Sequence, residues 1–118
     1  MVIYYKRLII FFAVFICLAI AYVIFKESIH LWFCENENNG ASCSIIGMIH
    51  HEHKEMERAE KYLKKSCDMG YGLGCFKLAL FHKENKSIDS KRKTHEYLSK
   101  ACVLEYESAC LMMKDKGR

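Results

Sequence analysis

Apolar residues are distributed differently at the beginning of this chain and in the rest of it. Residues 8 to 25 read LIIFFAVFICLAIAYVIF, with no charged side chain, whereas beyond residue 41 apolar and charged positions are interspersed. One set of apolar and small residues recurs at helical spacing, which places it on a single helix face: Met56, Ala59, Leu63 and Ser66. The pattern predicts one long apolar helix followed by amphipathic helices.

The amphipathic part divides into shorter elements. The chain has no proline, and no segment alternates convincingly with the period of two expected of a strand. We expect helices at roughly 41–51, 54–67, 73–83 and 91–103, followed by a short last one at about 107–115. The predicted fold class is therefore all-α.

The apolar run has the length of a membrane span. Eighteen residues at about 1.5 Å each reach about 27 Å, close to the thickness of a bilayer core. Lys6 and Arg7 precede it, which favours a cytoplasmic N-terminus. Ala19-Ile20-Ala21 resembles a signal-peptidase site, but cleavage there would split the run, and cleaved apolar regions are usually shorter. An uncleaved anchor is favoured, with a cleaved signal peptide as the alternative.

This interpretation divides the chain into four parts and places most of it in the cell envelope. The domain would be periplasmic and held at the inner membrane, or secreted if the N-terminal helix is cleaved. The parts are a cytoplasmic N-terminus (1–7), a membrane helix (8–25), a juxtamembrane segment (26–40) and a helical domain (41–118).

The exported segment is nearly neutral and rich in cysteine. Residues 26 to 118 hold sixteen of the eighteen Lys and Arg residues and all fourteen Asp and Glu residues, a net charge of +2, so nothing indicates a nucleic-acid partner. They also hold six of the seven cysteines: Cys34, Cys43, Cys67, Cys75, Cys102 and Cys110. An even number in a small exported domain is typical of disulfides, and six cysteines allow 15 pairings. The cysteine spacings do not match the usual C-x₂₋₄-C of zinc sites or C-x-x-C of redox pairs.

The sequence also repeats itself. AEKYLKKSCDMGYGLGCFKL (59–78) aligns with THEYLSKACVLEYESACLMM (94–113) at a constant offset of 35. A fainter copy, LWFCENENNGASCSII (31–46), has one extra residue between its cysteines and lacks about one helical turn. A period near 34 residues with helical content predicts stacked helix–turn–helix repeats.

The repeated pattern, Tyr-Leu-x-Lys-small-Cys followed after seven residues by a second Cys, resembles the cysteine-rich Sel-one-like repeat family. These are relatives of the tetratricopeptide repeats and include the Helicobacter cysteine-rich proteins. The resemblance, over about residues 34 to 115, implies a short αα-hairpin solenoid with two repeats and a C-terminal fragment. It further implies disulfides between successive repeats, at Cys67–Cys75, Cys102–Cys110 and Cys34–Cys43. For the turn before Cys75, we expect Gly70, Gly72 and Gly74 to supply positive φ angles.

Polar chemistry along the chain is sparse. His50 and His53 are three residues apart and are weak candidates for metal ligands, although a solvated turn is favoured; we predict no cofactor and no metal site. The resemblance implies penicillin binding and β-lactamase activity, for which the chain offers one S-x-x-K, beginning at Ser90, without the accompanying motifs. Ser90 is better explained as a helix N-cap, so the catalytic residues stay unknown.

Two hypotheses of function therefore stand. The favoured one is a non-enzymatic envelope module that binds a protein or peptide in the groove of its repeats. The alternative is a β-lactam-binding hydrolase, with a β-lactam or cell-wall-like ligand. By the resemblance, the first helix of each repeat lines the concave face, and Leu63, Phe76, Leu80 and Leu98 pack between helices. The candidate binding residues on that face are Met48, His51, Lys77 and Phe81. For Met48 and Phe81 a position in the core is the favoured alternative.

Overall fold

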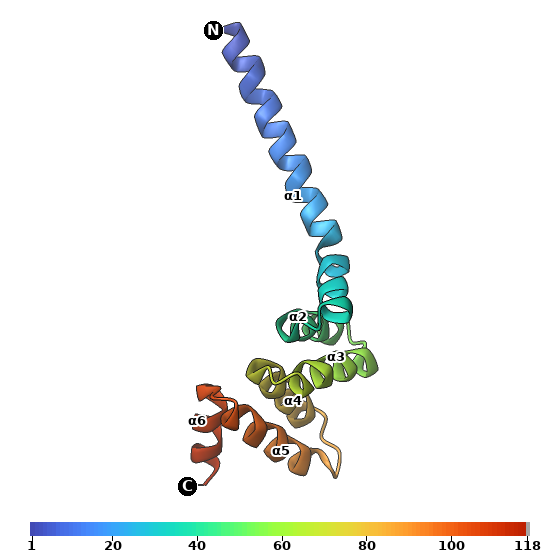
Figure 1. The fold of residues 1–118 in the computed structure, drawn as a ribbon, viewed down its shortest axis with the longest axis vertical. Helices are drawn as coiled ribbons and strands as arrows, with labels where there is room; N and C mark the ends of the chain where they lie inside the picture. The colour runs from blue at the N-terminus through green and yellow to red at the C-terminus, as the bar shows by residue number, and fades with distance from the viewer. Residues whose placement is uncertain (118) are drawn as a thin grey trace.

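The computed structural model describes residues 1 to 117, which form six α-helices and contain no strand (Figure 1). α1 (Val2–Asn36) is a single helix of 35 residues that stands away from the rest of the molecule. The predicted apolar helix is confirmed, but it does not end with the apolar run. Because neither proline nor glycine interrupts residues 26 to 36, most of the predicted juxtamembrane segment continues the same helix.

The remaining five helices are 10 to 14 residues long. They are α2 (Gly40–Glu52), α3 (Met56–Asp68), α4 (Gly72–Glu84), α5 (Ser90–Val103) and α6 (Glu107–Lys116). Each predicted boundary lies within two residues of the observed one. Each helix packs against the next one in the chain, and α2 also reaches α4 across α3. The helices therefore progress away from the end of α1, so the two termini lie at opposite ends of the molecule (Figure 1).

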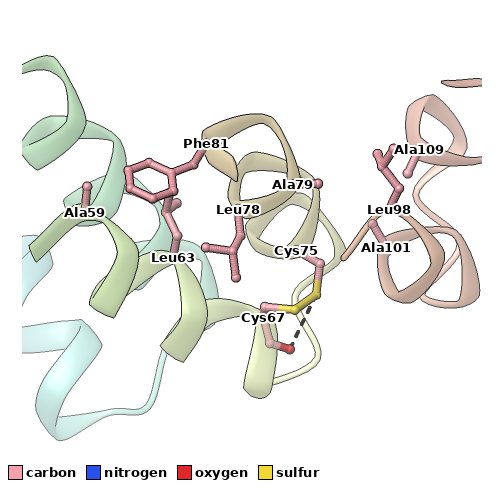
Figure 2. Close-up of a cluster of buried hydrophobic side chains, with 10 residues drawn as sticks. All are labelled: Ala59, Leu63, Cys67, Cys75, Leu78, Ala79, Phe81, Leu98, Ala101 and Ala109. Atoms are coloured by element: carbon pink, nitrogen blue, oxygen red, sulfur yellow. Dashed lines mark hydrogen bonds between the residues drawn. A yellow bond between two sulfur atoms is a disulfide. The ribbon is translucent and has the colours of Figure 1, made fainter. Parts of the chain in front are cut away.

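The core is small and continuous from α3 to α6. Figure 2 shows Leu63 of α3 facing Leu78 and Phe81 of α4, with Leu98 on α5 further along. Small residues complete the contacts between neighbouring helices: Ala59, Ala79, Ala101 and Ala109. A second cluster joins α1 to α2 and α3 and consists of Cys34, Cys43, Ile46 and Tyr62. The end of α1 is therefore part of the packed domain.

Three disulfides join consecutive helices. Cys34–Cys43 connects α1 to α2, Cys67–Cys75 connects α3 to α4, and Cys102–Cys110 connects α5 to α6, with Cα–Cα distances of 4.7, 4.4 and 4.7 Å. These are the three pairs that the resemblance implied. Among the described residues the free cysteine is Cys17, which is exposed on α1.

Each disulfide-closed turn contains one residue in the left-handed region. These residues are Asn38 (φ 48°), Gly70 (φ 78°) and Glu105 (φ 62°). The expectation that Gly72 and Gly74 would also supply positive φ is wrong, because both lie inside α4. Their lack of a side chain serves packing instead. A Cβ at Gly72 would lie 3.1 Å from Tyr106 Cβ, and one at Gly74 would lie 2.6 Å from Ser66 Cβ.

Candidate functional site

The four predicted binding residues come together in one groove. α2 supplies Met48 and His51, and α4 supplies Lys77 and Phe81. The groove has a volume of about 170 Å³, and its lining is completed by Glu52, Leu63, Leu80 and Glu84. It therefore lies between α2 and α4 with α3 contributing to its floor.

Phe81 is buried, which agrees with the core position that the sequence favoured for it over an exposed binding position. Only 4% of its surface is accessible, and its ring makes edge-to-face contacts with His51 and His82 at centroid distances of 5.6 and 5.4 Å. The reason is that α4 packs against both α3 and α5 and has apolar residues on more than one face, so its periodicity does not distinguish groove from core. Phe81 forms part of the floor, while Met48, His51 and Lys77 are half-buried at the walls.

The packing of the other predicted core residues also differs in part. Leu63 and Leu98 are buried as expected, with 2% and 1% of their surfaces accessible. Phe76 and Leu80 are only half-buried. Leu80 lines the groove, so it is available to a ligand.

A polar contact spans the groove at one end. His51 Nε2 lies 3.1 Å from Glu84 Oε2, which joins the C-terminal parts of α2 and α4. The groove thus combines an apolar floor with a polar contact at its rim. Met48 adds a flexible, polarizable side chain that can adapt to an inserted group.

Two histidines, His50 and His82, are buried in the helical domain, although the sequence favoured a solvated turn for His50. His50 stacks on Tyr62 and His82 stacks on Tyr97, both at ring-centroid distances of 5.5 Å. Burial lowers the pKa of His82, and the neighbouring Glu60 carboxylate only partly opposes this effect. The signal in the sequence was a His seven residues after Cys43 and again seven residues after Cys75, together with Tyr62 and Tyr97 at an offset of 35.

The two candidate metal ligands, His50 and His53, have different surroundings. His50 Nδ1 lies 2.9 Å from Glu55 Oε2, and His53 is exposed at the end of α2. Within residues 1 to 117, no group of three or more His, Cys, Asp or Glu side chains could hold a metal ion.

Ser90 is the first residue of α5, and the helix N-cap is Asp89, so the predicted N-cap role is wrong by one position. The Asp89 carboxylate instead accepts hydrogen bonds of 2.8 and 3.0 Å from Arg92, which lowers its pKa. Ser90 is buried and lines an open cavity of about 610 Å³. Four lysines surround that cavity: Lys83, Lys86, Lys91 and Lys116.

Comparisons with protein-family models, with curated proteins and with solved structures found no match to this chain.

Proposed function

We propose that this protein is a membrane-anchored interaction module whose α2–α4 groove binds one apolar side chain of a peptide or protein partner in the cell envelope. The observation that carries the proposal is the groove itself. Its volume of about 170 Å³ is below the range of about 300–1,000 Å³ typical of small-molecule sites. A single anchoring side chain on an extended partner suits a groove of that size, since binding energy concentrates at such anchors.

The fold proposed for this function is a short repeat solenoid of the cysteine-rich Sel-one-like type. Equivalent features recur in successive helix pairs and support it. Gly70 N–H donates to the Cys67 carbonyl and Glu105 N–H to the Cys102 carbonyl, at 2.9 and 3.0 Å. The His–Tyr stacks and the disulfides recur in the same way. On this model, α2 and α4 are corresponding helices, and solenoids of this kind bind partners on the surface that such helices share.

The first repeat is completed by a helix that the sequence pattern included only in part. The end of α1 carries Cys34 at the position that Cys67 occupies on α3, and the left-handed residue follows in both turns, Asn38 four residues after Cys34 and Gly70 three residues after Cys67. We propose that α1 supplies the helix that the first copy of the motif lacks in part.

Peptide selection followed by matched substitutions tests the groove. Displayed peptides would be selected on the full chain in detergent micelles, and the dissociation constant of a selected peptide would be measured for each variant. Met48→Lys places a charge in the groove, whereas Met56→Lys changes an exposed methionine outside it. We expect Met48→Lys to weaken binding at least about tenfold, which corresponds to about 1.4 kcal/mol, and Met56→Lys to leave it unchanged.

Two results would contradict this proposal. Equal binding by the Met48→Lys variant, with its helical circular dichroism intact, would show that the wrong face has been chosen. The hydrolase implied by the resemblance makes a separate prediction, which is turnover of a chromogenic β-lactam that Ser90→Ala abolishes. Such turnover would replace the interaction module by an enzyme.

A further inference from the structure

The last two turns of α1 have two different faces. On one face, Leu31 and Cys34 pack into the cluster that joins α1 to the domain. On the other, Ile29, Trp32 and Phe33 are exposed, with 44%, 52% and 40% of their surfaces accessible. None of these three side chains belongs to a packed cluster of the described chain; the polar Asn36 lies beside them, and its side-chain amide donates a hydrogen bond of 3.1 Å to the Trp32 carbonyl.

The domain is held firmly on the first of these faces. The Cys34–Cys43 disulfide fixes α1 to α2, and the Tyr62 hydroxyl donates a hydrogen bond of 3.1 Å to Glu35 Oε1. Rotation of α1 against the domain would break the hydrogen bond and is restrained by the covalent disulfide. Trp32 and Phe33 are therefore kept pointing away from the domain.

The exposed face continues the apolar surface of the membrane helix. Tyr22, Phe25, Ile29 and Trp32 follow one another at spacings of three, four and three residues, which is one stripe along a helix. The Trp32 and Phe33 rings meet edge to face at 5.2 Å, so they form one aromatic unit. The stripe thus passes from the uncharged run into the last turns of α1, with the charged Lys26 beside it, four residues after Tyr22 and three before Ile29.

The distance along α1 from the middle of the apolar run to Trp32 is close to half the thickness of a bilayer that includes its headgroups. The midpoint of the run 8–25 lies between residues 16 and 17. At about 1.5 Å per residue, Trp32 lies about 23 Å beyond it, and a bilayer with its headgroups extends about 20–22 Å from its centre. Helical side chains lean toward the helix N-terminus, which brings the indole closer to the membrane. On the other side, Tyr4 and Tyr5 lie about 19 and 17 Å from the midpoint, which is the level of Ile29 and closer to the bilayer centre than Trp32.

We propose that Ile29, Trp32 and Phe33 insert into the outer headgroup region of the bilayer and seat the domain directly on the membrane surface. The inference rests on the proposed membrane anchor. Tryptophan and tyrosine favour membrane–water interfaces because their rings are apolar with one polar group. The continuity of this face with the membrane span and its match to the bilayer half-thickness favour lipid as its occupant.

Trp32 is the only tryptophan in the chain, so its fluorescence reports this contact without labelling. The full chain would be reconstituted in phosphatidylcholine–phosphatidylglycerol vesicles containing lipids brominated either near the headgroup or near the end of the acyl chain. We expect blue-shifted emission, stronger quenching by the shallow bromines than by the deep ones, and protection from aqueous iodide.

A control variant separates this inference from the anchor itself. Trp32→Phe combined with Ile16→Trp moves the only tryptophan to the middle of the apolar run, where deep bromines should quench it best. In one outcome, the deep bromines quench the Ile16→Trp probe while Trp32 of the unchanged chain is quenched by iodide and by neither brominated lipid. That result would confirm the anchor and refute the interfacial contact. If the Ile16→Trp probe is also insensitive to both lipids, the anchor itself fails.

The same measurements distinguish lipid from a second copy of the chain packed on the exposed face of α1. Trp32 would then be protected from iodide yet insensitive to brominated lipids, and the protein would cross-link as a dimer through α1. That outcome would overturn the proposal in favour of contact between two chains.

Discussion

Removing the Cys67–Cys75 disulfide should destabilise the domain more than removing Cys102–Cys110, although both bridges close loops of the same length. Each pair has a sequence separation of 8, so the chain-entropy model gives the same contribution of about 2.5 kcal/mol for each. The two pairs differ in their surroundings. Cys67 and Cys75 are 5% and 0% exposed within the main core, whereas Cys102 and Cys110 are half-buried.

The difference between the two pairs measures packing alone. Replacing Cys67 and Cys75 by alanine removes two buried sulfur atoms from the core that Figure 2 shows. If each is worth about 0.8 kcal/mol, as a buried methylene is, the extra cost is about 1.6 kcal/mol. The total is then about 4 kcal/mol for the central pair against about 2.5 for the peripheral one. Domains are typically stable by about 5–15 kcal/mol, so the central loss brings a small domain close to unfolding.

Guanidinium titration of the oxidised full chain in mild detergent, followed by far-ultraviolet circular dichroism, would measure both losses. The Cys102→Ala, Cys110→Ala variant is the matched control for Cys67→Ala, Cys75→Ala. Equal losses for the two variants would show that packing of the sulfur atoms contributes nothing. No loss in either variant would refute the entropic contribution as well.

Three further outcomes are expected. Burial lowers the pKa of His82 in the folded state, so as the pH falls through about 6.5 the unfolded state binds a proton that the folded state does not, and stability should decrease. In thermal melts at several pH values, His82→Gln should flatten this dependence, whereas the exposed control His95→Gln should not. A Cβ at Gly47 would lie 2.7 Å from Leu63 Cγ, so Gly47→Ala should cost about 1–3 kcal/mol by chemical denaturation, whereas Gly117→Ala, with 3.5 Å of clearance, should cost little. The mature protein should begin near Met1 and resist carbonate extraction from membranes; a soluble form beginning at Tyr22 would instead establish a cleaved signal peptide.

The helices were predictable because their signals are local. The stripe through Met56, Ala59 and Leu63 and the absence of proline define them without knowledge of the packing. The residues of the groove were predictable only as positions on α2 and α4. For Phe81 the sequence left groove and core open, with core favoured, because its burial depends on how α4 fits between its two neighbouring helices.

Two further features depended on tertiary contacts. The roles of Gly72 and Gly74 follow from the side chains that approach them, Tyr106 and Ser66, and not from their own backbone angles. The burial of His82 follows from its stacking on Tyr97 of the next helix. In each case the partner lies outside the residue's own helix, so residue type and spacing alone favoured the more common local explanation.

Nearest-neighbour disulfides also have a consequence for how the protein is made. In a chain that crosses the membrane from its N-terminal side, Cys34 and Cys43 emerge first, then Cys67 and Cys75, then Cys102 and Cys110. Each cysteine thus meets its native partner before the next pair arrives, and only 8 or 9 residues separate the two. Of the 15 possible pairings, the native one is the one that oxidation in order of emergence produces. We therefore expect biosynthesis to need an oxidase but no isomerase to correct wrong pairs.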